Sequence, residues 1–229
     1  MIMAENISIA IDGPAAAGKS TVAKRVAKIL GFTYIDTGAM YRAVTNECIV
    51  RGLDPKDESQ AVKVLPGIDI ELNPDGSVYC NGKDVSKPIR EPLVSGNVSY
   101  IAAMVPIRLA LVDIQREMAN KKNVVMDGRD IGTYVLPNAQ VKIFQIASVE
   151  TRAKRRYEEN LGKGLKTTYK EVEDDVRNRD YIDSHRSFAP LKPAEDSVLI
   201  DTSDMSIEEA VDAVLDVIHS KMGIEIPCH

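Results

Sequence analysis

The amino-acid sequence predicts an α/β fold in which a five-stranded parallel sheet is flanked by helices. Three observations lead to this prediction. Five short apolar segments alternate with helical patterns, a glycine-rich loop follows the first segment, and polar clusters follow the first four. Strands that alternate with helices form parallel sheets with right-handed crossovers, and ligands bind at the carboxyl ends of such strands.

The five predicted strands are short apolar runs. They lie at residues 7–12, 32–36, 123–127, 141–146 and 197–201. Helical patterns separate most of these runs, and those over residues 108–119 and 207–218 have an apolar face.

One region, at about residues 62–90, breaks the alternation. Three short strand-like runs occur there, separated by the turn sequences NPDG at residues 73–76 and NG at residues 81–82. An Asn-Gly pair between two such runs is typical of a two-residue hairpin turn. The sequence therefore predicts a small antiparallel insert.

The first strand leads into the most specific motif of the chain. Residues 13–21 read GPAAAGKST, match G-x-x-x-x-G-K-[ST], and precede an amphipathic helical pattern over residues 22–30. In such a loop, backbone amides and the start of a helix surround phosphate, the lysine adds charge, and the serine hydroxyl reaches magnesium. The alternative is a structural glycine turn.

The predicted triphosphate-binding residues are those of this loop and the helix start. They are Gly13, Pro14, Ala15, Ala16, Ala17, Gly18, Lys19, Ser20 and Thr21. We expect Gly13 and Gly18 to adopt backbone angles at which a side chain would clash.

Two further polar clusters follow predicted strands. Thr37 and Arg42 come after the second strand, where Arg42 is suited to hold an acceptor phosphate. Asp127, Arg129 and Asp130 follow the third. We expect Asp127 to hold magnesium through a water molecule, with the loop serine as a further metal residue, Arg129 to reach a phosphate, and Asp130 to accept from a base amino group. The alternatives are a helix cap with a surface arginine, and a strand-end turn with a local ion pair.

A strongly basic stretch over residues 152–170 stands out in a chain of net charge −5. Its glycines at 162 and 164 are suited to a hinge, so we predict a lid at residues 151–170 that closes over the triphosphate and stabilises charge on the moving phosphoryl group. Charge runs are more often solvated helix faces, which is the alternative. Arg179, Asp183 and Arg186 are spaced i, i+4, i+7 and are expected on one helix face, where they suit a nucleotide or form a surface ion-pair stripe.

Composition limits the class of protein. The 229 residues are enough for one domain with an insertion, and the acidic balance argues against general nucleic-acid binding. Cys48, Cys80 and Cys228 show neither a disulfide framework nor zinc spacing, which favours a reducing compartment. No signal peptide, membrane-spanning segment or histidine metal site is expected, so we predict a cytoplasmic protein.

These motifs together resemble the bacterial cytidylate kinases, a branch of the nucleoside monophosphate kinases. The resemblance covers nearly the whole chain and is carried by residues 12–21, 36–42, 127–133 and 178–191. It implies a single P-loop kinase domain over residues 1–229, with a monophosphate-binding region at 37–108 that includes the insert. It also implies phosphoryl transfer from MgATP to CMP and dCMP, giving ADP and CDP or dCDP.

The resemblance also implies roles for individual residues. The cytosine contacts would be Thr37, Ser99, Arg108 and Asp130. The CMP phosphate would be held by Arg42, Arg129 and Arg186. Asp183, with Arg179 beside it, would contact the ribose, and either Arg155 or Arg156 would face ATP. Lys19 and Arg129 would be catalytic, and Ser20 and Asp127 would hold the metal.

Thr37 stands where serine is also found in that family, and its added methyl group can alter the ranking of CMP and dCMP. Three other functions remain as alternatives. They are a kinase for a different small acceptor such as another monophosphate or shikimate, a GTPase-like switch, and a nonenzymatic nucleotide-binding scaffold. The switch lacks a guanine-reading motif, because the NGKD sequence at residues 81–84 lies in the predicted insert. We expect small-molecule substrates, no nucleic-acid or membrane partner, a monomer, and no fused domain after the last helix.

Overall fold

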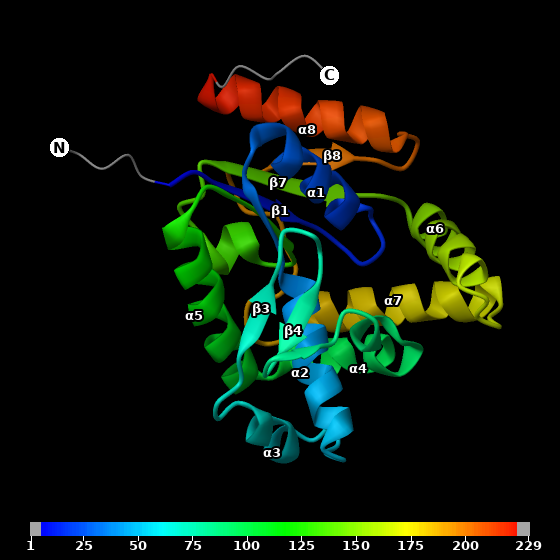
Figure 1. Ribbon diagram of the computed structural model, residues 1–229. Coiled ribbons are helices and arrows are strands. Elements are labelled where there is room, and N and C mark those ends of the chain that lie inside the picture. Colours follow the sequence, from blue (N-terminus) through cyan, green and yellow to red (C-terminus); the bar gives the residue numbers. More distant parts are fainter. Residues whose placement is uncertain (1–5, 224–229) are drawn as a thin grey trace. The chain divides into compact units, whose positions relative to one another are not determined.

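The computed structural model describes residues 6–223 (Figure 1), and the chain forms two compact units. The sheet unit comprises the described residues up to Tyr34 and from Lys122 onward, and the insert unit comprises Ile35–Lys121. The predicted monophosphate-binding region, residues 37–108, falls within the insert unit. Cys228 and residues 1–5, on which part of the sequence argument rests, lie outside the described residues.

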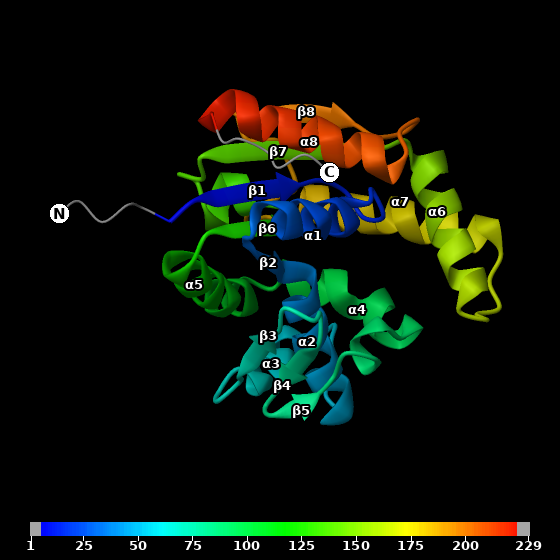
Figure 2. The same ribbon diagram turned by 45° about the horizontal axis from the view of Figure 1, so that its top comes forward.

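The sheet unit is built on the predicted five-stranded parallel sheet, in the order β2-β6-β1-β7-β8 (Figure 2). The strands are β1 (Ser8–Asp12), β2 (Thr33–Asp36), β6 (Val124–Gly128), β7 (Val141–Ile146) and β8 (Val198–Asp201). All five predicted strands are confirmed, with ends that differ by one residue at most.

The register of the sheet brings several strand ends to one edge. Strand β1 lies between β6 and β7, and Asp12 at its end is paired with Gly128 on one side and Phe144 on the other. Because these strands are parallel, the residues that follow them emerge at the same edge. The loop after β1 and the acidic end of β6 are therefore neighbours.

Helices α1 (Lys19–Leu30) and α8 (Ile207–Met222) pack beside each other against the sheet (Figure 2). Their apolar faces enclose a core with the side chains of alternate strand residues, including Ile9 and Ile11 of β1. Helix α8 begins with a capping box between Ser206 and Glu209, so its first turn has side-chain partners for its backbone amides. The predicted helical patterns at residues 22–30 and 207–218 are thus confirmed.

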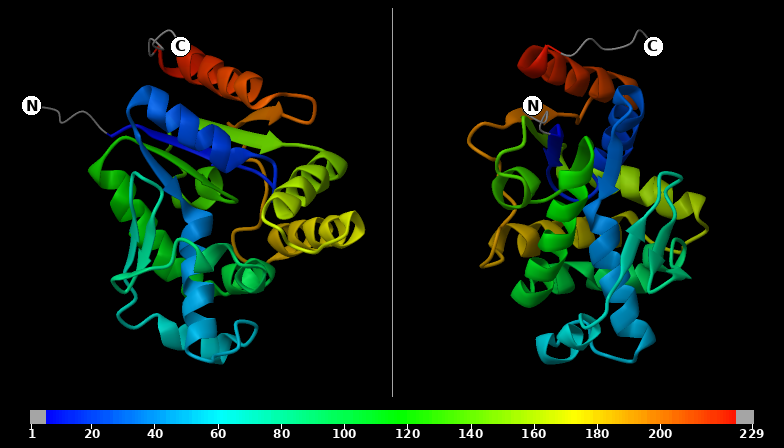
Figure 3. Two further views of the ribbon diagram at one scale, coloured as in Figure 1. Left: turned by 45° about the vertical axis from the view of Figure 1, so that its right-hand side comes forward. Right: turned by 60° about the vertical axis from the view of Figure 1, so that its left-hand side comes forward.

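Helices α6 (Val149–Gly162) and α7 (Tyr169–His185) pack together and are joined by a short turn in which Gly164 has φ of 72° (Figure 3). The predicted lid at residues 151–170 corresponds to most of α6, this turn and the start of α7; its closure stays a prediction. The expectation that Arg186 shares a helix face with Arg179 and Asp183 is wrong. Helix α7 ends at His185, and Arg186 has extended backbone angles.

The insert unit is a helical core with a small sheet. Its helices are α2 (Thr37–Val50), α3 (Glu58–Ala61), α4 (Pro92–Ala103) and α5 (Val105–Lys121), with short 3₁₀ turns η1 (Val62–Val64) and η2 (Pro88–Arg90). Helix α2 is buried on most sides, and its apolar residues pack with those of α4, α5 and the sheet. Figure 1 shows α2 beside α4.

The predicted antiparallel insert is confirmed as β3 (Ile70–Leu72), β4 (Val78–Cys80) and β5 (Lys83–Asp84). Cys80 is paired with Lys83, which leaves Asn81 and Gly82 as a two-residue turn with φ of 51° and 73°. Positive φ at both positions is what a type I′ hairpin turn requires, and Asn-Gly is the pair that adopts it most readily.

Among residues 6–223, no single helix is both long and apolar enough to cross a membrane. Only α4 and α5 taken together, across a sharp bend, meet the criteria of length and composition.

Candidate functional site

The loop after β1 has the backbone geometry expected of a phosphate-binding loop. Gly13 and Gly18 have φ of 149° and 88°, and Ala16 has φ of 59°. A Cβ atom on Gly13 would lie 1.9 Å from the Gln145 carbonyl oxygen, so the loop packs against the β7 backbone with no room for a side chain. This confirms the expectation that Gly13 and Gly18 adopt angles that disfavour other residues.

Neighbouring side chains hold two loop carbonyls from outside. Arg152 Nη1 donates to the Ala15 oxygen at 3.1 Å, and Gln145 Nε2 donates to the Ala17 oxygen at 2.7 Å. In a planar trans peptide, the C=O and the following N–H point in opposite directions. The amides of Ala16 and Gly18 are therefore turned away from these donors, which is the orientation that favours an anion.

Lys19 is buried beside the loop, and its Nζ donates to the Pro14 oxygen at 2.7 Å. Burial, together with the nearby Arg129 cation, lowers the pKa of Lys19 to about 7, although Asp127 and Asp12 act in the opposite direction. A bound polyphosphate would favour the charged lysine and raise this pKa again.

The predicted metal residues are direct neighbours. Asp127 Oδ2 accepts from Ser20 Oγ at 2.8 Å, and Asp127 Oδ1 accepts from the Tyr34 hydroxyl at 2.8 Å. No group of three or more His, Cys, Asp or Glu side chains suited to a metal occurs within residues 6–223. A hydroxyl and one carboxylate nevertheless fit Mg²⁺, which commonly uses one or two carboxylates together with substrate phosphates and water.

Asp12 connects the end of β1 to the segment after β6. Its two carboxylate oxygens accept from the amides of Ile131 and Gly132 at 2.8 and 2.7 Å, in a π-helical turn, η3 (Ile131–Val135). Burial raises the pKa of Asp12 to about 7, because the two amide hydrogen bonds offset only part of the loss of water.

The predicted phosphate arginines of the sheet unit are paired with carboxylates. Arg129 Nε donates to Asp183 at 2.9 Å, and Arg186 Nη2 lies 3.2 Å from Asp130 Oδ1. Burial alone would lower the pKa of Arg129, but Asp183 outweighs burial, so that pKa is raised. Each guanidinium has five N–H donors, and the ion pair with the carboxylate uses only part of them. The pairs therefore orient both arginines and leave donors that can bind an anion.

The positive charge of Arg179 is balanced less completely by nearby carboxylates than the charges of Arg129 and Arg186. Burial lowers its pKa to about 10, and the Arg156 cation contributes in the same direction. Its Nε is buried and has no hydrogen-bond partner among the described residues. Such a donor favours a site for an anion.

The two lid arginines differ in their surroundings. Arg155 Nη2 donates to the Thr202 oxygen at 2.8 Å, and a Cβ on Gly18 would lie 3.9 Å from Arg155 Nη1. Arg156 lies 3.7 Å from Glu159 and is near enough to affect the pKa of Arg179. Arg155 is thus beside the phosphate loop, and Arg156 is near the arginines of α7.

The candidate residues of the insert unit are also buried. Thr37 begins α2, Ser99 lies on α4 and Arg108 on α5, each at most 5% exposed. Arg108 Nη1 donates to the Ala102 oxygen at 2.8 Å, and its guanidinium lies over the Tyr41 ring, 5.4 Å from the centroid. The Arg108 side chain therefore connects α5 with α4 and α2.

Arg42 is held at the start of α2. Its Nη2 donates to Asp36 Oδ2 at 3.0 Å, while Asp36 Oδ1 caps the helix through the Ala39 amide. The Nε of Arg42 is buried without a hydrogen-bond partner among the described residues. Like Arg179, it is a donor that suits an anion.

The structure brings together the candidates of the sheet unit as a loop, a Ser–Asp pair and two Arg–Asp pairs at one sheet edge. Sequence reasoning missed Tyr34, Gln145 and Arg152, which contact Asp127 or the loop. The signal for Gln145 was a polar residue inside an apolar strand. Arg152 was indistinguishable by sequence from the other arginines of its basic run.

Known proteins resemble this chain in sequence and in fold. The sequence model of the cytidylate kinase family matches residues 9–220. A cytidylate kinase from Anoxybacillus flavithermus is 51% identical over 223 residues, 96% of this chain and 99% of that protein. One from Bacillus subtilis is 50% identical over 222 residues, 96% of this chain and 99% of that protein. A solved gluconokinase from Sinorhizobium meliloti aligns with a TM-score of 0.51 and 13% identity over 95% of this chain and 94% of that one; this likeness concerns fold alone.

We expect Gly13→Ala to destabilise the protein by about 3 kcal/mol or more, because the new methyl group would overlap the Gln145 carbonyl. The control is Gly31→Ala, where φ is also positive but no atom lies within 4 Å, so about 1 kcal/mol of strain is expected. Urea unfolding measures both values. Equal losses for the two variants would contradict the close approach.

The buried Asp12 carboxyl should make stability depend on pH. Its pKa is higher in the folded protein than the ordinary 3.8, so its stabilising contribution is complete below about pH 4 and is lost as the pH rises through about 7. The unfolding free energy of the unmodified chain should therefore fall relative to that of Asp12→Asn between pH 5 and pH 7.5. Urea unfolding across this range measures the difference, and a constant difference would show that Asp12 does not titrate there.

Proposed function

The chain belongs to the cytidylate kinase family of nucleoside monophosphate kinases, and we propose that it transfers the γ-phosphoryl group of MgATP to CMP and dCMP. The products are ADP and CDP or dCDP. The observation that carries this proposal is the phosphate loop beside three cations of the same unit, of which Lys19 is buried and Arg129 and Arg179 are partly buried. Burial lowers the pKa of Lys19 and Arg179, which favours a polyanionic ligand.

The proposed mechanism consists of positioning and charge neutralisation. An acceptor phosphate is already ionised at neutral pH, so no general base is needed, and the protein must align the acceptor oxygen with the γ-phosphorus. Lys19 and the arginines neutralise charge on the moving phosphoryl group. Ser20 and Asp127 would hold Mg²⁺, which supplies further charge neutralisation when it is bound.

We assign the acceptor phosphate to Arg42, Arg129 and Arg186, and the ribose to Asp183 with Arg179. The buried Nε donors of Arg42 and Arg179 support an anionic ligand for each unit. We assign Arg155 to the donor nucleotide, because it lies beside Gly18 of the phosphate loop. Arg156, near Arg179, is assigned to the moving phosphoryl group.

We assign cytosine to Thr37, Ser99, Arg108 and Asp130. Cytosine offers an amino donor and two acceptors, so the Asp130 carboxylate accepts from the amino group while Arg108 and Ser99 donate. Uracil would place a carbonyl oxygen against the carboxylate, and an unpaired polar group of this kind discriminates strongly between substrates. All four side chains are buried, which increases the cost of a mismatch.

We further propose that the lid closes over the bound nucleotides and that the protein accepts dCMP as well as CMP. We also propose that it is a monomer in the cytoplasm.

The experiment that tests the proposal is ADP release from MgATP with CMP, dCMP, UMP, AMP, GMP and shikimate as separate acceptors. Turnover with CMP and dCMP at least about tenfold above the other acceptors supports it. If another acceptor is turned over faster than CMP and dCMP, the protein is still a kinase but the assignment of cytosine to these residues is wrong. ATP hydrolysis independent of any acceptor would overturn the kinase proposal itself.

Lys19→Ala should lower kcat by on the order of 10²–10³-fold, because one charge that stabilises the transferring phosphoryl group is lost. The control is Lys24→Ala, an exposed position on the same helix, which should retain full turnover. Coupled-assay kinetics and circular dichroism together measure activity and folding. Full activity of a folded Lys19→Ala protein would exclude the assigned role.

Asp130→Asn should reduce the preference for CMP over UMP by about tenfold or more, because an amide can donate to the uracil carbonyl while a carboxylate cannot. Asp196→Asn is the control and should leave the preference unchanged, because the Asp196 side chain is 62% exposed and is paired with Lys142 rather than with a residue assigned to the base. The measurement is kcat/KM for both acceptors. An unaltered ratio in Asp130→Asn would mean that this carboxylate does not contact the base.

A further inference from the structure

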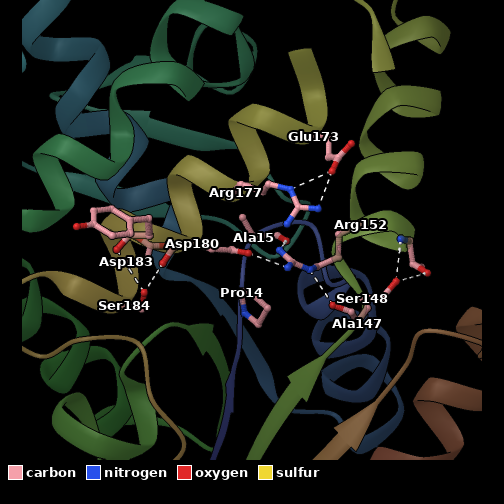
Figure 4. Close-up of polar contacts among 12 residues, drawn as sticks. Pro14, Ala15, Ala147, Ser148, Arg152, Glu173, Arg177, Asp180, Asp183 and Ser184 are labelled. Carbon is pink, nitrogen blue, oxygen red and sulfur yellow. Dashed lines mark hydrogen bonds and ion pairs between the residues drawn. The ribbon is translucent and has the colours of Figure 1, made fainter. Parts of the chain in front are cut away.

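Arg152 binds three segments of the sheet unit with one guanidinium (Figure 4). It lies in the first turn of α6 and is 4% exposed. Its Nε donates to the Ala147 oxygen at 2.9 Å, its Nη1 to the Ala15 oxygen at 3.1 Å, and its Nη2 lies 2.7 Å from Asp180 Oδ2. The strand end before α6, the phosphate loop and helix α7 thus meet at one side chain.

Asp180 is the counterion that this buried cation requires. A buried guanidinium carries a full positive charge and has no acceptor atom, so it needs an opposite charge and carbonyl oxygens around it. The other oxygen of Asp180, Oδ1, is buried and accepts no hydrogen bond within the described part of the chain. Arg152 is therefore the direct ion-pair partner of this carboxylate, while the Arg129 cation is near enough to interact with it electrostatically.

The two ends of this ion pair lie next to residues of the proposed site. On α7, Asp180 directly follows Arg179 and precedes Asp183 by one turn. In the loop, the Ala15 carbonyl is held by Arg152, which turns the amide of Ala16 in the opposite direction. Ala16 has φ of 59°, a conformation that a residue with a side chain adopts only when its surroundings impose it.

We propose that Arg152 is a positioning residue that couples helix α7 to the phosphate loop, so that triphosphate binding depends on the Arg152–Asp180 ion pair. Arg152 keeps the loop in the conformation that presents the Ala16 amide, and Asp180 holds the Arg152 guanidinium in the place where it can do so. This inference rests on the proposed function only in taking the loop to be the ATP site.

The test is direct binding of ATP to the full chain by calorimetry, with CMP measured separately. The variants are Arg152→Lys, which keeps the charge but cannot reach three separate acceptors, and Asp180→Asn, which keeps the shape but removes the counterion. Each should weaken ATP binding by about tenfold or more and CMP binding by less than about threefold. Because both residues act through one contact, the double variant should be no more than about twofold weaker than the worse single variant.

The matched control is Arg177→Gln. Arg177 lies on the same helix in an ion pair with Glu173 at 2.7 Å, but its side chain is 51% exposed and contacts neither the loop nor the arginines assigned to the nucleotide (Figure 4). This exposed pair should contribute little, so ATP and CMP affinities should stay within about twofold of those of the unmodified chain.

The outcomes separate the inference from the proposed function. If the unmodified chain does not bind ATP, the proposed function fails. If it binds ATP and the folded Asp180→Asn variant binds it equally well, the coupling is wrong. Equal losses for ATP and CMP, or additive losses in the double variant, would mean that the pair only stabilises the fold. If Arg152→Lys does not fold, Asp180→Asn alone tests the coupling. A loss of ATP affinity of about tenfold or more with a loss of CMP affinity of less than about threefold supports it, and equal losses contradict it.

Discussion

The close approach of the phosphate loop to β7 is the constraint on which the rest of the sheet unit depends. A Cβ on Gly13 would lie 1.9 Å from the Gln145 oxygen, far inside van der Waals contact, so no side chain fits at this position. The side chain of Gln145 also donates a hydrogen bond to the Ala17 carbonyl. Strand β7 therefore contacts the loop at Gly13 through its backbone and at Ala17 through a side chain. Because β1 is also paired with β6, the loop serine lies within hydrogen-bond distance of Asp127.

Buried charge is the second theme of this unit. Arg129, Arg152 and Arg186 each face a carboxylate, and these pairs determine the directions in which the guanidinium groups point. Lys19 and Arg179 differ, because burial lowers the pKa of both. The protein by itself therefore stabilises their charged forms incompletely, and a phosphate anion would supply the missing compensation.

The chemistry and the choice of acceptor rest on different parts of the chain. The loop, Lys19 and the Ser20–Asp127 pair would serve any phosphoryl acceptor. Membership of the cytidylate kinase family decides against the shikimate kinase, switch and scaffold alternatives. The base-reading proposal depends instead on Asp130 and the buried polar residues of the insert unit, such as Arg108.

The sequence by itself determined the sheet, the loop and the hairpin, because each has a local cause. Apolar runs of strand length, a glycine motif between strand and helix, and an Asn-Gly pair act over a few neighbouring residues, and all three were predicted within a residue or two. Only the tertiary structure decided which arginines are buried and what they face. Arg152 and Arg156 are both arginines of one basic run, yet the first contacts the loop and Asp180 while the second lies near Glu159. The i, i+4, i+7 spacing of Arg179, Asp183 and Arg186 predicted one helix face, but helix α7 ends at His185, one residue before Arg186. Such partners come from segments far apart in the chain, and the packing that unites them leaves no periodic trace in the sequence.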